Sequence, residues 1–133
     1  MLNNNNGGTK HDSKKIRLDL LSPASIIGQA RAITYGVTKY DERNWENGLA
    51  FSRLYRAALS HLLNWWQGKE IDDGPDGSGL RHIDLAACNL HFLQHYVEHY
   101  DEKYKKFDNR PIYEKRASTD GLAESSKIDS VGE

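Results

Sequence analysis

The stretch GKEIDDGPDGSGLRH, residues 68–82, gathers the side chains of this chain that are best suited to chemistry. Glu70, Asp72, Asp73 and Asp76 offer carboxylate oxygens, which are the ligands that a hard cation such as Mg²⁺ prefers. Their spacing does not match an EF-hand, which needs alternating acids, a glycine and a later glutamate. A solvated connector between two helices would carry the same residues, so the loop alone leaves both interpretations open.

Two histidines flank this acidic loop in the sequence. His61 falls within a predicted helix over residues 53–67, and His82 begins a predicted helix over residues 81–105. If these helices fold back as a hairpin, both imidazoles come near the loop. Each histidine lies at the margin of an apolar helix face, where a purely structural role is common. Taken together with the acids between them, a shared site is an equal alternative.

A second group of residues could bind a nucleotide. Basic side chains precede and follow the first predicted helix, and their charge-assisted hydrogen bonds neutralise phosphate oxygens. They are Lys10, Lys14, Lys15, Arg17, Lys39 and Arg43. Tyr40 and Trp45 could stack on a base while Asn44 hydrogen-bonds its edge. A solvated basic arm, and a tryptophan that fills the end of a helical bundle, explain the same residues.

Several functional classes lack support. The chain contains no GxxxxGK[ST], GxGxxG or GxSxG motif, so P-loop, Rossmann and serine-hydrolase sites are not indicated. The net charge of −1 gives no field that would attract nucleic acid or an anionic membrane. The single cysteine, Cys88, excludes an internal disulfide and lies among small residues, as inert packing would. We expect a soluble, cytoplasmic protein, because no signal peptide or membrane-length apolar run is visible.

The hydrophobic pattern predicts an all-α bundle built on a helix hairpin. Ser22 and Pro23 are suited to the N-cap and first position of a helix that reaches Val37. Ser52 is a candidate cap for the helix over 53–67, and Gly68 stands where a terminating glycine belongs. Strand-like alternation does not persist anywhere in the sequence.

Composition predicts one folded domain over residues 10–107, between a disordered tail over 1–9 and a polar, mostly disordered tail over 108–133. A core of this size is marginal alone, and association between copies is a common remedy. The third helix carries a predicted core stripe that includes Leu90 and Val97. A second apolar stripe on the same helix, Leu85, Phe92 and Tyr96, indicates either that this helix is central in the bundle or that the stripe meets another subunit, and we expect the interface of a homo-oligomer.

Four blocks in order resemble the dATP/dGTP diphosphohydrolase N-terminal domain family, which is common in phages. They are KHDSKKIRLDLLSP (10–23), YGVTKYDERNW (35–45), SRLYRAALSHLLNWWQGKEID (52–72) and SGLRHIDLAACNLHFL (78–93). The resemblance implies hydrolysis of a purine deoxynucleoside triphosphate to the monophosphate and pyrophosphate, in phage nucleotide-pool metabolism. It also implies a link to the all-α nucleotide pyrophosphohydrolases of the MazG type, and the host cytoplasm as the location if the chain is phage-encoded.

The resemblance also implies roles for individual residues. One or two Mg²⁺ or Mn²⁺ ions would be held by Glu70, Asp72, Asp84, His61 and His82, and all of these except Asp84 would be catalytic. The triphosphate would be bound by Lys10, Lys15, Arg17, Lys39 and Arg53. Tyr40, Asn44 and Trp45 would hold the purine, with Asn89 also on the substrate side. The partners expected are the nucleotide and a second copy of the chain, with neither a membrane nor a nucleic acid polymer.

Two alternatives to an enzyme stay open. The ExxE…ExxD metal signature of MazG-type enzymes is not present in that form, and only EHYD, residues 98–101, matches its second half. A nucleotide-binding module without catalysis, such as a sponge for a signalling nucleotide, would use the same basic and aromatic groups. A small interaction domain would bind no nucleotide at all.

Overall fold

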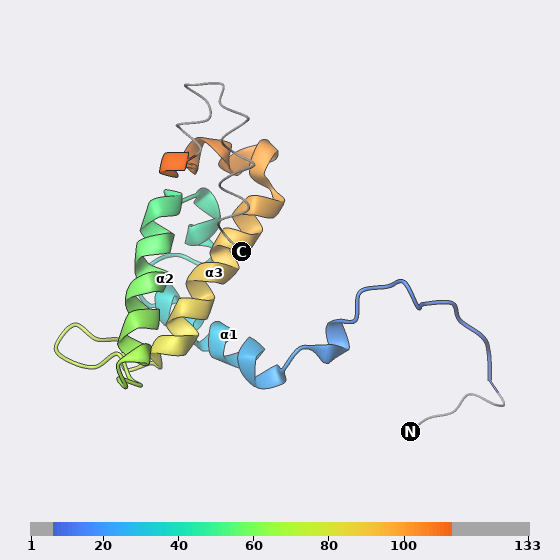
Figure 1. The fold of residues 1–133 in the computed structure, drawn as a ribbon, viewed down its shortest axis with the longest axis horizontal. Helices are drawn as coiled ribbons and strands as arrows, with labels where there is room; N and C mark the ends of the chain where they lie inside the picture. The colour runs from blue at the N-terminus through green and yellow to red at the C-terminus, as the bar shows by residue number, and fades with distance from the viewer. Residues whose placement is uncertain (1–6, 113–133) are drawn as a thin grey trace.

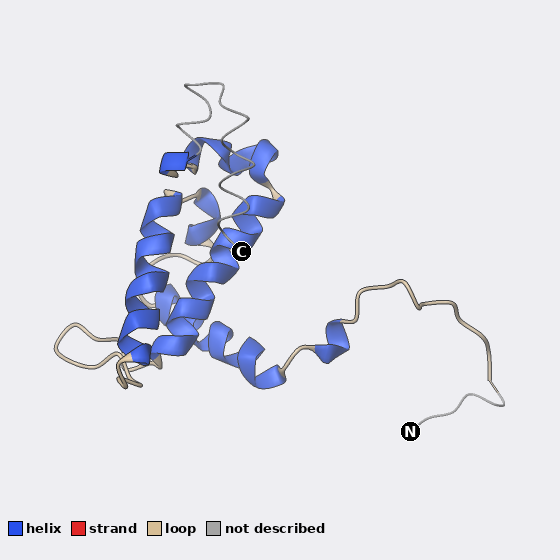
Figure 2. Ribbon diagram, viewed as in Figure 1, coloured by secondary structure: helices blue, strands red, loops and turns tan. Residues whose placement is uncertain are grey.

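The computed structural model describes residues 7–112, and within that range it contains helices and no strand (Figures 1 and 2). The three main helices are α1 (Pro23–Val37), α2 (Phe51–Trp66) and α3 (His82–Glu98). Short turns of other helix types are η1 (Leu18–Leu20), η2 (Asn44–Asn47), η3 (Tyr100–Tyr104) and η4 (Lys105–Phe107). The all-α class is confirmed. The predicted tails fall largely on residues 1–6 and 113–133, which lie outside the described residues.

The helices begin where local or distant groups satisfy their free N–H donors. Ser22 caps α1 as predicted, because its side chain accepts a hydrogen bond from the backbone N–H of Ser25 at 3.3 Å, with Pro23 next in the chain. In α2 the prediction was wrong. The N-cap is Ala50, and Ser52 lies inside the helix, where its backbone N–H donates to Asn109 Oδ1 at 3.0 Å.

The third helix is shorter than predicted and ends at Glu98. A π-helical turn, η3, follows it and reverses the chain over the start of α2. Tyr96 and Tyr104 are buried together with Phe51 and Leu54, and these residues form the hydrophobic core. Packing continues past residue 107. The buried Asp108 accepts a hydrogen bond from the Tyr100 hydroxyl at 2.6 Å and from the guanidinium of Arg110 at 2.8 Å.

The predicted core stripe of α3 is buried only in part: Ala86 is in the core and Leu93 packs against it, but other members of the stripe are exposed. Tyr96 is 0% exposed, whereas Leu90 and Val97 are 52% and 60% exposed. Phe92 and Tyr96 are covered by aromatic rings from outside the helix. Trp45 stacks on Phe92 with 4.6 Å between the ring centroids, and Phe51 stacks on Tyr96 with 5.9 Å between them. Phe92 and Tyr96 therefore pack against the chain's own aromatic residues, as expected if this helix is central in the bundle, and not at an interface between copies.

The contact between α1 and α3 depends on one close approach. A Cβ atom at Gly28 of α1 would lie 2.3 Å from Asp84 Oδ1. Asp84 in turn accepts two hydrogen bonds from the Arg81 guanidinium, at 3.0 and 3.2 Å. Glycine is therefore needed here for the two helices to meet at this distance. In the described part of the chain, every helix is too short or too polar to cross a membrane.

Candidate functional site

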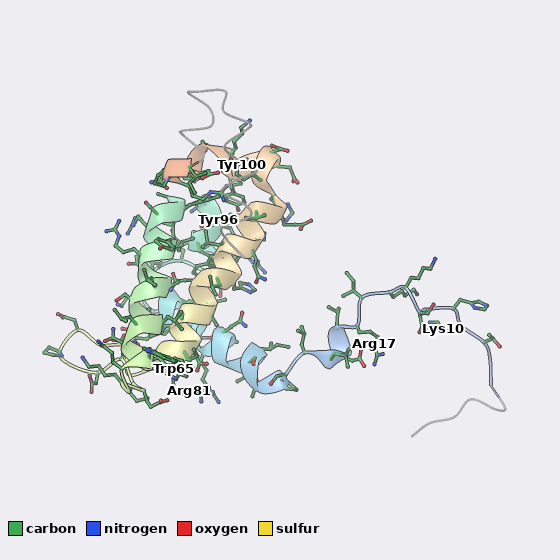
Figure 3. The ribbon with its side chains drawn as sticks, viewed as in Figure 1. Lys10, Arg17, Trp65, Arg81, Tyr96 and Tyr100 are labelled. Atoms are coloured by element: carbon green, nitrogen blue, oxygen red, sulfur yellow. The ribbon has the colours of Figure 1, made fainter. Side chains whose placement is uncertain are left out.

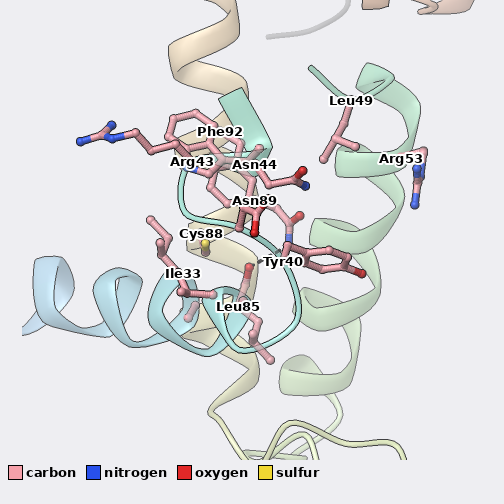
Figure 4. A pocket seen from close by; sticks show the side chains of 15 residues that line it. Ile33, Tyr40, Arg43, Asn44, Leu49, Arg53, Leu85, Cys88, Asn89 and Phe92 are labelled. Carbon is pink, nitrogen blue, oxygen red and sulfur yellow. Dashed lines mark hydrogen bonds between the residues drawn. The ribbon is translucent and has the colours of Figure 1, made fainter. Parts of the chain in front are cut away.

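A cavity of about 560 Å³ opens between α1, the segment that follows it, the start of α2 and one face of α3 (Figure 4). Its volume lies within the range of small-molecule binding sites. The contribution of α3 is Leu85, Cys88, Asn89 and Phe92, which share one face at helical spacing. The remaining lining residues are Ala32, Ile33, Gly36, Val37, Tyr40, Asp41, Arg43, Asn44, Trp45, Leu49 and Arg53.

The cavity brings together much of the substrate-binding set that the resemblance implied. Tyr40, Asn44, Trp45, Arg53 and Asn89 all line it. Tyr40 is 61% exposed, and Figure 4 shows that Tyr40 and Asn44 extend from the loop towards α2. Trp45 instead stacks on Phe92 with an interplanar angle of 19°, so it forms part of the wall. Its carbonyl oxygen also accepts a hydrogen bond from the Tyr96 hydroxyl.

The backbone of this loop is strained next to the cavity. Arg43 has a φ of 60°, a left-handed conformation that costs a non-glycine residue roughly 1–2 kcal/mol. An ion pair between its guanidinium and Glu46, at 2.6 Å, helps to hold the turn. Figure 4 shows the Arg43 side chain pointing away from the cavity, whereas the neighbouring Asn44 points over it. This left-handed residue, which was not predictable from the sequence, directly precedes η2, where Asn44 and Trp45 lie.

A second cluster joins the two predicted histidines. The Nδ1 atoms of His61 and His82 lie 2.9 Å apart, so one ring donates a hydrogen bond and the other accepts it. Burial lowers the pKa of His61. The Asp72 carboxylate opposes this shift, and His82 adds to it. Two of the predicted catalytic residues are thus in direct contact, with Asp72 close enough to act on both electrostatically.

The acidic loop is anchored at both of its ends. Asp72 Oδ2 accepts hydrogen bonds from the backbone N–H and the hydroxyl of Ser78, at 3.1 and 2.9 Å. The backbone N–H of Asp72 donates to Leu80 at 2.8 Å, and that of His82 donates to the carbonyl of Glu70 at 2.9 Å. Burial acts to raise the pKa of Asp72, but the two bonds from Ser78, together with the nearby His61 and His82, outweigh it and the pKa is lowered. The loop thus fixes Asp72 beside the histidines as a carboxylate.

The other two predicted metal ligands are directed elsewhere. Asp84 is buried, and both of its carboxylate oxygens accept hydrogen bonds from the Arg81 guanidinium. The negative charge of Glu70 also helps to raise the pKa of Arg81. Across residues 7–112, no group of three His, Cys, Asp or Glu side chains is placed to hold a metal ion. The arrangement therefore does not fit a preformed metal centre.

The basic residues of the N-terminal segment lie far from the cavity. Figure 3 shows Lys10 and Arg17 on an arm that extends away from the helices, and Lys15 lies between them in the sequence. Arg17 pairs with Asp19 at 2.7 Å. Lys39 is next to Tyr40, but its ammonium group lies over the Tyr35 ring at 4.9 Å. Of the predicted phosphate-binding residues, Arg53 lines the cavity.

Sequence reasoning missed the apolar side of the cavity. Leu85 and Phe92, which the sequence predicts at an oligomer interface, line the cavity with Asn89, and their spacing from Asn89 on one helix face is the signal for this. Cys88 lines the cavity too. Burial raises the pKa of its thiol to about 11, which suits the inert packing role expected from the sequence.

The sequence profile of the dATP/dGTP diphosphohydrolase N-terminal family matches residues 5–110, so the chain belongs to this family. The match covers all three main helices, the cavity and the histidine cluster. No curated protein and no solved structure matches the chain.

Proposed function

We propose that this member of the dATP/dGTP diphosphohydrolase N-terminal family binds a purine deoxynucleoside triphosphate in the cavity and hydrolyses it to the monophosphate and pyrophosphate. The observation that carries the proposal is the meeting of Tyr40, Asn44, Trp45, Arg53 and Asn89 around one cavity of about 560 Å³. These residues come from a loop and two helices that are separated in the sequence. A nucleotide needs this combination of an aromatic face, amide groups and a cation.

The base would occupy the apolar part of the cavity. Tyr40 offers an exposed ring for stacking, and the amides of Asn44 and Asn89 can hydrogen-bond to the base edge. Ile33 and Leu85 supply the apolar surface beneath it. Arg53, at the start of α2, is the cation within reach of a phosphate bound in the cavity.

The histidine cluster is the candidate catalytic group. His82 precedes the cavity residue Leu85 on α3 by three positions, a separation of about 4.5 Å along the helix axis. The cluster therefore lies just beyond this end of the cavity, and a triphosphate that extends from Arg53 along α2 towards His61, eight residues or about 12 Å further on, would approach His61, His82 and Asp72. The lowered pKa of His61 favours an unprotonated imidazole, the form that can accept a proton from an attacking water. A divalent ion such as Mg²⁺ or Mn²⁺, which the family implies, stays a prediction.

Calorimetry and product analysis on the full chain test the proposal together. We expect dGTP or dATP to bind, and to be converted to dGMP or dAMP and pyrophosphate in the presence of Mg²⁺ or Mn²⁺. His61→Ala should keep binding within about twofold and lose turnover, because His61 does not line the cavity. If no common nucleotide binds or raises the melting temperature of the wild-type chain, the proposal is wrong.

A nucleotide-binding module without catalysis is the second candidate. One observation favours it: the cavity lining includes none of His61, Asp72 and His82, so binding can occur without the cluster. The same calorimetry in EDTA separates the two candidates. Tight binding in EDTA, with no product in any divalent metal, would identify a module such as a nucleotide sponge.

A further inference from the structure

The hydroxyl groups of two buried tyrosines hold the backbone of η2, the turn that forms part of the cavity wall. Tyr96 donates a hydrogen bond to the carbonyl of Trp45, and Tyr104 donates one to the carbonyl of Glu46 at 2.7 Å. The two tyrosines are 0% and 2% exposed, so both bonds are shielded from water. Burial raises the pKa of both side chains, to about 12 for Tyr96, so the hydroxyls keep the protons that they donate.

The chain reversal after α3 brings the second tyrosine to this place. In a continuous α-helix, Tyr96 and Tyr104 would be about 12 Å apart along the axis. Their rings instead stack with 4.3 Å between the centroids, because α3 ends at Glu98 and the π-helical turn η3 follows it. Turns of this type are rare and occur frequently at functional sites. As a result, the two hydroxyls reach neighbouring carbonyls of η2.

A third contact to the same loop comes from η4. The ring of Phe107 lies against Gly48, and a Cβ atom at Gly48 would be 2.2 Å from that ring. Gly48 also has a φ of 109°, a conformation that favours glycine. Aromatic side chains from the end of α3, from η3 and from η4 therefore hold the loop at positions 45, 46 and 48.

These contacts act against the strain in the loop. Arg43, directly before η2, has a left-handed φ of 60°, and a residue in this conformation persists where the surrounding structure holds it. The ion pair between Arg43 and Glu46 is a weak restraint, because the Arg43 side chain is 79% exposed and water screens the pair. The buried hydroxyls of Tyr96 and Tyr104 are the stronger restraint on the loop.

We propose that Tyr96 and Tyr104 are positioning residues for the nucleotide, and that they hold η2 so that Asn44 and Trp45 stay at the cavity. This inference rests on the proposed function. Neither tyrosine lines the cavity, so both act through the loop. When the loop has its binding geometry in only a fraction of the molecules, the apparent affinity falls by that fraction. The histidine cluster lies on other elements, so loosening η2 raises KM and leaves kcat nearly unchanged.

Calorimetry of the full chain with dGTP or dATP tests the proposal. Tyr104→Phe should bind the nucleotide roughly 3- to 10-fold more weakly than the wild type, the effect of losing one hydrogen bond. Tyr96→Phe together with Tyr104→Phe should weaken binding further. Tyr100→Phe is the matched control, because its hydroxyl lies in the same segment but donates to Asp108 instead of the loop. This control should be less stable than the wild type in urea and should keep the wild-type affinity.

The fluorescence of Trp45 measures the hold on the loop without any nucleotide. The chain has three tryptophans, so a background with Trp65→Phe and Trp66→Phe leaves Trp45 as the only one. Acrylamide should quench it more strongly after Tyr104→Phe, and to the same extent as in the background after Tyr100→Phe.

The outcomes separate this inference from the proposed function. A wild-type chain that binds no nucleotide overturns the proposed function, and this inference with it. A wild type that binds, with affinity unchanged in Tyr104→Phe or reduced equally in Tyr100→Phe, overturns this inference alone, whatever the quenching.

Discussion

His61 and His82 are separated by 21 positions in the chain, yet their Nδ1 atoms face each other at 2.9 Å. The contact joins the middle of α2 to the first residue of α3, at the end of the molecule where the acidic loop is anchored. One ring must accept the shared hydrogen bond through an unprotonated Nδ1. The pair therefore cannot keep its geometry with both rings charged, and the fold acquires a dependence on pH.

We expect stability to fall as the pH drops below about 6.5, the ordinary pKa of histidine. The pKa of His61 is lowered by burial in the folded state, so the unfolded chain binds the proton more readily. The stabilisation that unprotonated His61 gives to the folded state is fully present above the pKa of this histidine in the unfolded chain. It is lost as the pH falls through the pKa of His61 in the folded chain. Urea midpoints measured from pH 5 to 8 should fall more steeply for the wild type than for His61→Gln.

A control variant for this pH profile is His11→Gln, since His11 lies on the exposed N-terminal arm. Its midpoints should follow the wild type at every pH. Asp72, whose pKa is also lowered, acts in a separate window below about pH 4, where its stabilising contribution is lost. Identical slopes for the wild type and His61→Gln between pH 5 and 7 would contradict the role given to His61.

Gly28→Ala should destabilise the fold by about 1–3 kcal/mol, as overpacking of a close contact does. The new Cβ would meet the Asp84 carboxylate at 2.3 Å, and Asp84 is a short side chain held by two bonds from Arg81. Gly36→Ala, in the same helix, meets nothing within 4 Å and should stabilise by about 0.5–1 kcal/mol. Chemical denaturation of both variants checks this, and equal effects would show that the α1–α3 contact is not tight.

The all-α class and the approximate helices were predictable, because apolar spacing and an N-cap such as Ser22 are local signals. The start of α2 was not predictable, because its acceptor is Asn109, 57 residues further along the chain. The two stripes of α3 show the same limit. Periodicity reveals that both are apolar, but it does not say which one the rings of Trp45 and Phe51 will cover.

The site divides in the same way. Tyr40, Asn44 and Trp45 are close in the sequence, so they were predictable as one group. All three line the cavity because the segment that carries them packs against α3. The places of two of the acids, Asp84 and Glu70, did not follow from the sequence. Asp84 and Glu70 were suitable metal ligands by type, but an ion partner, Arg81, stands three residues before Asp84 and satisfies it locally. A carboxylate three residues after an arginine on a helix is placed to form an ion pair with it.

Tyr40→Ala should weaken nucleotide binding by roughly 5- to 100-fold, because stacking of a base on an aromatic ring contributes about 1–3 kcal/mol. Tyr40 is exposed, so the variant should fold normally. Tyr40→Phe should retain most of the affinity, since the ring is kept. Tyr35→Ala is the matched control, because Tyr35 is not among the residues that line the cavity. Calorimetric affinities that are unchanged in Tyr40→Ala would place the base elsewhere.

Asn109→Ala should destabilise the chain by about 1 kcal/mol, as the loss of a helix cap does. The Asn109 side chain accepts from the backbone N–H of Ser52 and donates to the Ser52 hydroxyl at 2.8 Å, so it caps α2 from a distant segment. Asn109→Asp should restore most of the loss, because it keeps the acceptor and adds a negative charge near the helix N-terminus. Urea unfolding followed by circular dichroism measures both effects. If the alanine and aspartate variants are equally destabilised, the packing of residues 108–110, rather than the cap, fixes the start of α2.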